Sequence, residues 1–207
     1  MRPSLLPALA LCVSLALAEG PSSLLAQSKE KPPSYSAPIK VLQLDGKEVD
    51  PFELSKGSIL VFVFLGNECP IANRYAPELR RIYDRFQPKG VHFWFVHPAK
   101  EESLLDIATH AKAYQTPGRV VADPSQTLAR FCGATITPEA AVFTPQGKLA
   151  YRGRIDDRFP SLNRHKPQAE VHDLLNALDD LLAQRQPAER SPGPAVGCRI
   201  QFQTPSP

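Results

Sequence analysis

The stretch "SILVFVFLGNECPIANRYAPELRRIYDRF" (residues 58–86) contains the features that decide the fold. Residues 58–66 are continuously apolar and rich in β-branched and aromatic side chains, which is typical of a strand buried on both faces of a largely parallel sheet. Residues 70–86 carry apolar side chains every three or four positions after an initial proline, which predicts an amphipathic helix. Pro77 should bend this helix. Cys69 stands at the junction between the predicted strand and the predicted helix.

The rest of the chain repeats this alternation of strand and helix. Residues 39–50 carry apolar positions on both sides of an Asp-Gly turn signal, which predicts a short hairpin. The later patterns predict, in order, strand 91–98, helix 101–114, strand 119–123, helix 124–133, an antiparallel hairpin over 139–154 and a helix over 171–185. Right-handed crossovers place helices on both faces of such a sheet, so we expect an α/β fold with a mixed central sheet.

The first eighteen residues have the composition of an export signal. Arg2 forms a short positive region, residues 5–17 an apolar core, and residues 16–18 a small-x-small cleavage site. The apolar run is short for a membrane span and is interrupted by proline near its start, so no stable span is expected. We therefore predict a cleaved signal peptide over residues 1–18 and a secreted or periplasmic protein.

Proline-rich polar segments flank the predicted domain. Residues 19–37 are expected to form a linker, residues 38–186 the α/β domain, and residues 187–207 a proline-rich tail that contains Cys198. The chain has 24 Lys and Arg against 21 Asp and Glu, and the two signs are interspersed, so nothing in the charge pattern indicates a nucleic acid or an anionic membrane as partner. The oligomeric state is left open.

Cys69 is the first candidate for chemistry. A thiol at the first turn of a helix faces unpaired backbone N–H groups and the positive end of the helix dipole, and both favour the thiolate. Glu68 opposes this effect because a neighbouring negative charge disfavours ionisation. The alternative is that Cys69 is an inert cysteine of the core.

Two further cysteines remain after signal cleavage. Cys132 lies near the end of a predicted helix, where the dipole disfavours a thiolate, and we interpret it as structural. Cys198 follows the proline-rich linker in a short alternation of apolar and polar residues, which predicts a β-segment with Cys198 on its apolar face. The twelve-residue linker spans on the order of 20 Å on average, enough to bring Cys198 to Cys69. Cys198 is thus either a resolving thiol or a residue that fills a groove beneath an edge strand.

Several motifs resemble the thioredoxin-like superfamily and, within it, the AhpC/TSA redoxins. They are "FLGNECP" (64–70), "ITPEAAVF" (136–143) and "TPEAAVFTPQGKLAYRGRIDD" (137–157). The resemblance implies a thioredoxin-like α/β/α sandwich and thiol-based oxidoreductase or antioxidant activity. It also implies a cis-proline at Thr137-Pro138 beside the thiol, where the residue before the proline contacts the partner.

The chain departs from the family pattern at the thiol. Ala72 stands where thioredoxins and exported disulfide reductases have a second cysteine, so release by a neighbouring thiol is impossible. Gly66 and Phe62 occupy positions where peroxiredoxins carry the threonine and proline of their peroxide-binding motif. A disulfide reductase of the usual kind and a fast peroxidase are both disfavoured.

Two arginines are candidate substrate-binding residues. Arg74 lies one turn beyond Cys69 on the predicted helix, and Arg154 lies in the charged segment that follows the hairpin. Either could stabilise a thiolate or its leaving group, although the ordinary interpretation of the segment around Arg154 is alternating surface charge.

No metal site is predicted. The histidines lack metal-ligand spacing. Copper-handling proteins that resemble this fold have a second cysteine four positions after the first, where this chain has Asn73. A copper site would therefore need His97 or His165 as a ligand instead. Copper handling and a redox-silent peptide-binding module remain the alternatives to an enzyme.

The sequence therefore predicts an exported thiol oxidoreductase without a cofactor. Cys69 would attack a peroxide or a disulfide of a protein or small molecule, and Cys198 or an external thiol reductant would complete the cycle.

Overall fold

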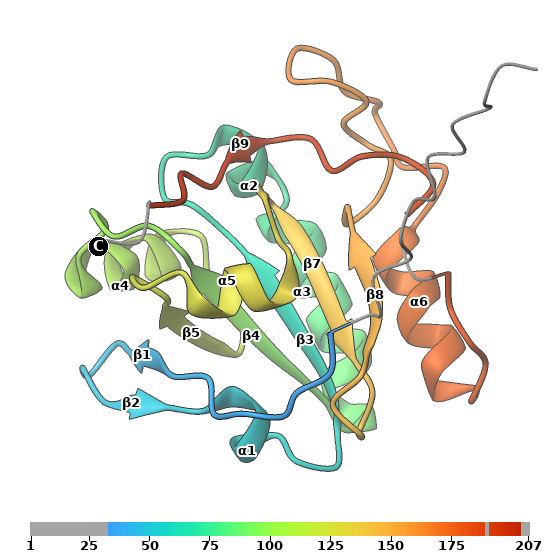
Figure 1. Ribbon diagram of the computed structural model, residues 1–207. Helices are drawn as coiled ribbons and strands as arrows, with labels where there is room; N and C mark the ends of the chain where they lie inside the picture. Colours follow the sequence, from blue (N-terminus) through green and yellow to red (C-terminus); the bar gives the residue numbers. More distant parts are fainter. Residues whose placement is uncertain (1–32, 189–190, 204–207) are drawn as a thin grey trace, which may run out of the picture. The chain divides into compact units, whose positions relative to one another are not determined.

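A computed structural model describes residues 33–188 and 191–203 (Figure 1). The predicted signal peptide and most of the predicted linker lie outside these residues. The predicted domain and the part of the tail around Cys198 lie within them.

The described strands form a seven-stranded mixed sheet in the order β2-β1-β5-β4-β3-β7-β8 and a separate two-stranded sheet, β6-β9. The strands are β1 (Val41–Gln43), β2 (Glu48–Val49), β3 (Ile59–Phe64), β4 (Val91–His97), β5 (Arg119–Ala122), β6 (Ile136–Thr137), β7 (Glu139–Phe143), β8 (Leu149–Gly153) and β9 (Cys198–Arg199). β3 is central: it runs parallel to β4 and antiparallel to β7, and all its residues are buried. The predicted buried strand and mixed sheet are confirmed.

Helices cover both faces of the large sheet (Figure 1). They are α1 (Pro51–Leu54), α2 (Pro70–Arg74), α3 (Ala76–Phe86), α4 (Leu104–Ala113), α5 (Thr127–Cys132) and α6 (Asp173–Leu182), with a 3₁₀ turn, η1 (Gln87–Lys89), after α3. Among the described helices, none has the length and apolar character needed to cross a membrane.

The predicted helix over 70–86 is divided at Tyr75 into α2 and α3. Pro77 explains the division, because it has no N–H to donate to the carbonyl four residues earlier and its ring crowds that carbonyl. The helix predicted over 101–114 starts later, at Leu104, because Ser103 and Asp106 form a capping box.

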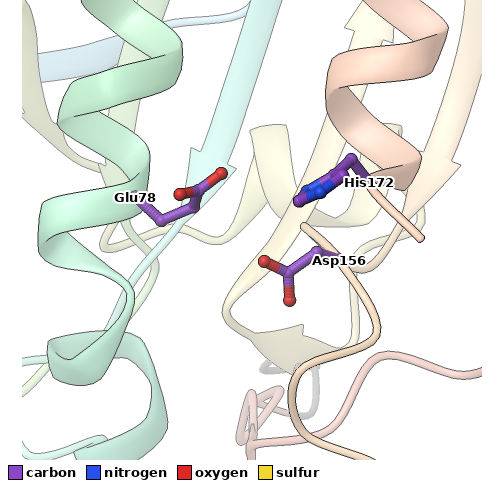
Figure 2. Close-up of side chains that lie close together, drawn as sticks. All are labelled: Glu78, Asp156 and His172. Atoms are coloured by element: carbon purple, nitrogen blue, oxygen red, sulfur yellow. The ribbon is translucent and has the colours of Figure 1, made fainter. Parts of the chain in front are cut away.

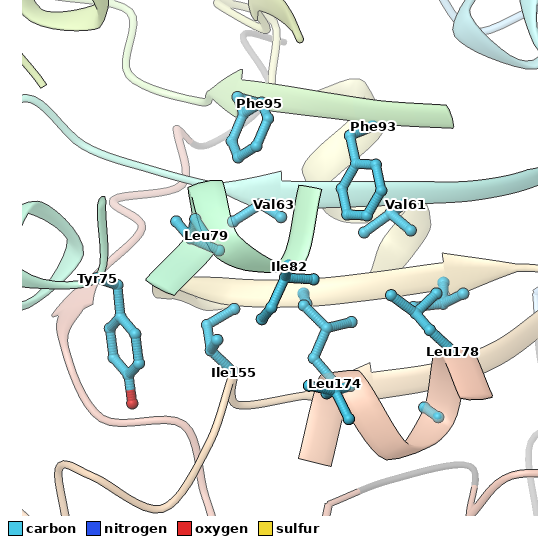
Figure 3. Packing of buried hydrophobic residues seen from close by; sticks show 14 of the residues in the cluster. Val61, Val63, Tyr75, Leu79, Ile82, Phe93, Phe95, Ile155, Leu174 and Leu178 are labelled. Carbon is cyan, nitrogen blue, oxygen red and sulfur yellow. The ribbon is translucent and has the colours of Figure 1, made fainter. Parts of the chain in front are cut away.

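The core has two parts, one on each face of the sheet. Side chains alternate along a strand, so Val61 and Val63 point to one face while Phe62 and Phe64 point to the other. Figure 3 shows the first part, where the strand residues meet side chains from α3 and α6. The labelled side chains are Val61, Val63, Tyr75, Leu79, Ile82, Phe93, Phe95, Ile155, Leu174 and Leu178. Cys69, Ile71 and Ala72 belong to this part of the core, which ties the start of α2 to the sheet.

Candidate active site

Cys69 is the N-cap residue of α2. Its backbone is extended, and its sulfur accepts a hydrogen bond from the Ala72 N–H at 3.4 Å. The sulfur also lies 2.9 Å from the Thr137 carbonyl oxygen, to which the thiol can donate. Only 2% of the residue is exposed. The cysteine that follows the central strand is therefore held by the helix N-terminus on one side and by β6 on the other.

The surroundings of Cys69 favour its ionised form. Burial raises the pKa of the thiol, but hydrogen bonds with the Thr137 side chain, the Ala72 amide and Cys198 act against burial, and the net pKa lies below its ordinary value. Glu68, which the sequence suggested as an opposing charge, is exposed and is not among the main influences on this pKa.

The Thr137-Pro138 peptide bond is cis, as the resemblance implied. Thr137 joins the two candidate thiols: its carbonyl contacts Cys69, and its backbone pairs with Cys198 across the antiparallel β6-β9 ladder. Its hydroxyl oxygen also lies 3.4 Å from the Cys198 carbonyl oxygen.

Cys198 lies next to Cys69 and is exposed. Burial, a hydrogen bond with Cys69 and the charge of Cys69 raise the pKa of Cys198 to about 11. Of the two thiols, Cys69 is therefore the one that loses its proton at the lower pH. The tail forms the predicted β-segment, and Val196 and Ile200, which share the predicted apolar face with Cys198, pack against the core. Cys198 itself is an exposed residue whose side chain contacts Cys69. Cys132 is fully buried in the core and its pKa is raised well above the ordinary value, in line with a structural role.

The tail is anchored on both sides of Cys198. Before it, Gly197 passes so close to β6 that an added Cβ would overlap the Thr137 carbonyl. After it, the Ile200 N–H donates to the Thr135 carbonyl at 2.9 Å. The Gln126 side chain donates to the Gln201 carbonyl at 2.7 Å and accepts from the Gln203 N–H at 3.0 Å. Figure 1 shows the resulting path of the described part of the tail, which passes over the end of the sheet to the region of α4 and α5.

A cleft of about 680 Å³ contains both thiols. Its wall includes the loop before α2, the segment before α4, Thr137 and the tail. Its charged lining residues are Glu68, Glu101, Glu102, Asp106 and Arg199. The cleft is thus locally acidic, although the chain as a whole has a formal charge of +3.

A part-buried polar network supports the loop that carries Cys69. Glu102 accepts a hydrogen bond from the Asn67 N–H at 2.8 Å, and its other carboxylate oxygen lies 2.9 Å from His97 Nδ1. Asn73 donates to the Asn67 carbonyl at 3.0 Å and contacts His110 Nε2 at 2.7 Å. Both backbone polar groups of Asn67 are therefore fixed, two residues before the thiol. The sequence analysis did not identify Glu102 as a residue of the site. The available signal was His97, a polar residue at the end of an apolar strand, which needs a polar partner such as Glu102.

The two predicted arginines lie elsewhere. Arg154 donates to Asp173 at 2.7 Å, and Arg74 is an exposed residue at the end of α2; neither is among the residues that line the cleft.

One group of potential metal ligands occurs among the described residues: Glu78, Asp156 and His172, which point toward a common space between α3 and α6 (Figure 2). Arg81 contacts Glu78 at 2.5 Å, and Arg158 lies 3.6 Å from Asp156, so the two carboxylates already have cationic partners. The group does not include Cys69, and it lends no support to a copper site at the thiol.

The central strand, the helix N-cap thiol and the cis-proline opposite it together define a thioredoxin-like thiol protein. Residues 29–152 match the AhpC/TSA family, and the chain belongs to it. Membership of this redoxin family indicates a thiol oxidoreductase.

Solved structures show the same fold. An uncharacterised conserved protein from Geobacillus kaustophilus is 27% identical, with a TM-score of 0.72 over 86% of this chain and 96% of that chain. A hypothetical protein from Sinorhizobium meliloti is 22% identical, with a TM-score of 0.71 over 85% of this chain and 96% of that chain. A secreted disulfide oxidoreductase of Mycobacterium tuberculosis is 15% identical, with a TM-score of 0.51 over 68% of this chain and 94% of that chain. A comparison with curated proteins found no match.

Proposed function

We propose that the protein is an exported thiol oxidoreductase in which Cys69 is the nucleophile and Cys198 the resolving thiol. The observation that carries this proposal is the meeting of the two thiols across Thr137, in surroundings that lower the pKa of the buried Cys69 and raise that of Cys198. A helix N-terminus and a neighbouring donor are the surroundings in which cysteine thiolates act as nucleophiles.

The first step is attack by the Cys69 thiolate on an oxygen of a peroxide or a sulfur of a disulfide. The peroxide would leave hydroxide or alkoxide and a sulfenic acid on Cys69; the disulfide would leave a thiolate and a mixed disulfide. The near-complete burial of Cys69 favours small oxidants, because a folded protein cannot reach the sulfur while the tail is docked.

The second step closes the Cys69–Cys198 disulfide. The Cys198 sulfur attacks Cys69 and displaces hydroxide or the substrate thiolate, and the Cys198 proton goes to that leaving group. The oxidant has then gained two electrons, and an external thiol must return two electrons to the protein.

The test is stoichiometric oxidation of the reduced mature protein with hydrogen peroxide and, separately, with hydroxyethyl disulfide. We expect a loss of two hydrogen atoms from the intact mass and a Cys69–Cys198 linkage in the peptide map. Cys198→Ser should stop the reaction at a sulfenic acid or mixed disulfide on Cys69, whereas Cys132→Ser should behave as the wild type.

Two free thiols after both treatments would refute the proposal and leave a redox-silent binding module. Export is tested separately: cell fractionation and N-terminal sequencing of the mature protein should find a start at Glu19, and an intact Met1 in the cytosolic fraction would contradict it.

A further inference from the structure

The two sulfurs of the proposed disulfide differ in access. Cys69 is 2% exposed and lies against Thr137, whereas Cys198 is an exposed residue of the cleft wall. An attacking thiolate approaches in line with the bond that breaks, so access to the attacked sulfur decides which sulfur reacts. From solvent, only the Cys198 side of this pair is open.

The two sulfurs also differ as leaving groups. Attack at Cys198 expels Cys69, whose thiolate receives a hydrogen bond from Ala72 and whose pKa is lowered. Attack at Cys69 would expel Cys198, and burial, the largest influence on the pKa of that thiol, raises it. A thiolate of lower pKa leaves faster, so chemistry and access favour the same sulfur.

The charge of the cleft restricts the attacking thiol. Glu68, Glu101 and Asp106 are exposed on its wall and Glu102 is partly exposed, while Arg199 is the lining cation among the described residues. The lining therefore carries a net negative charge opposite in sign to that of the whole chain. A cleft whose lining has a net charge of one sign concentrates ligands of the opposite charge and repels ligands of the same charge.

We propose that a cationic thiol reduces the Cys69–Cys198 disulfide by attacking Cys198. This step rests on the proposed function. The thiolate sulfur of the reductant bonds to Cys198 Sγ, the Cys69–Cys198 bond breaks, and its electron pair stays on Cys69. A second thiol of the reductant then attacks its own sulfur in the mixed disulfide and releases Cys198, which takes up a proton. The reductant is oxidised by two electrons and the protein regains both thiols.

The test uses the full mature chain, oxidised with diamide and purified as the disulfide. It is reduced with cysteamine, 2-mercaptoethanol or mercaptoethanesulfonate, which are cationic, neutral and anionic. Each rate is divided by the rate of the same thiol with hydroxyethyl disulfide, which removes differences in intrinsic reactivity. We expect cysteamine to exceed mercaptoethanesulfonate on the order of tenfold at low ionic strength, and we expect the ratio to approach one in 1 M salt.

Charge variants test the origin of this preference. Glu68→Gln combined with Glu101→Gln should lower the ratio, whereas Glu48→Gln combined with Asp84→Asn, which removes two exposed charges away from the cleft, should not. The attacked sulfur is located by acid quenching early in the reaction with cysteamine and mapping the adduct under acidic conditions; we expect it on Cys198.

The outcomes separate the two proposals. If diamide yields no Cys69–Cys198 disulfide, the proposed function fails and this step fails with it. If the disulfide forms but the normalised rates are equal, or if the early adduct lies on Cys69, the proposed function stands and the present inference is overturned.

Discussion

Replacement of Gly197 by alanine should release the tail from the active site. The alanine Cβ would overlap the Thr137 carbonyl, and both overlapping groups belong to the backbone or are attached directly to it, so neither can turn away. The overlap is relieved when the β6-β9 ladder opens, and opening moves Cys198 away from Cys69 and exposes Cys69 to solvent.

The size of the effect follows from what holds the tail. Ile200 is 9% exposed when docked, and burial of such a side chain contributes about 1.5 to 3 kcal/mol. At 1.36 kcal/mol for each factor of ten, the undocked state of the wild type is less populated than the docked state by roughly 10- to 150-fold. If Gly197→Ala removes the docked state, alkylation of Cys69 should accelerate by about that factor, because a buried thiol reacts through its open population.

The assay is alkylation by iodoacetamide, measured at the Cys69 peptide by mass spectrometry and extrapolated to full ionisation. Full ionisation matters because the variant also loses the Cys198 contact that lowers the pKa of Cys69. Gly193→Ala is the matched control: it also adds one methyl group to the tail, but the atoms nearest to that group belong to the end of the Arg154 side chain, which can move. A Cys69 rate within twofold of the wild type, or an equal acceleration in the control, would refute the reasoning.

Three further predictions concern ionisation and packing. Cys198→Ala should raise the pH midpoint of Cys69 alkylation, because it removes a hydrogen bond that lowers the pKa of Cys69; an unchanged midpoint would show that Cys198 does not contact the thiolate. Burial raises the pKa of Asp123 to about 6 from its ordinary 3.8, so its contribution to stability is present at low pH and is lost as pH rises through 6. Relative to Asp123→Asn, the free energy of unfolding of the wild type in urea should fall by about 2 to 3 kcal/mol between pH 4 and pH 7, and parallel pH curves would contradict this. Leu178→Ala on α6, a fully buried position, should lower the free energy of unfolding by about 2 to 5 kcal/mol, clearly more than Leu182→Ala at a partly buried position; equal losses would show that α6 packs differently from Figure 3.

Local patterns predicted the framework of the fold. The apolar run of β3 and the helix signal after Cys69 are visible within one stretch of chain, because burial on both faces and helical periodicity are local properties. The sequence predicted a bend at Pro77 but not the division of the helix into α2 and α3 at Tyr75. Whether a proline bends a helix or divides it depends on how the segments before and after it pack. The four-residue helix α1 was not predicted, because so short a segment has no periodicity to detect.

The site was predictable only in part. The placement of Cys69 follows from its position between strand and helix, and the linker length showed that Cys198 could reach it. The support from Glu102 was not predictable, because Asn67 and Glu102 are 35 residues apart and meet only when β3 and β4 pair. Arg154 was predicted near the thiol but pairs with Asp173 at the start of α6, a contact that depends on the packing of α6 against the end of β8.

The double anchoring of the tail links docking to redox potential. Any contact that holds Cys198 beside Cys69 raises the effective concentration of one thiol at the other, and so stabilises the disulfide over the dithiol. The midpoint potential of the pair would then become more negative by about 30 mV for each 1.4 kcal/mol of docking free energy. Gln126 holds the tail through Gln201 and Gln203, and is thus a residue through which the potential could be adjusted without replacing either thiol.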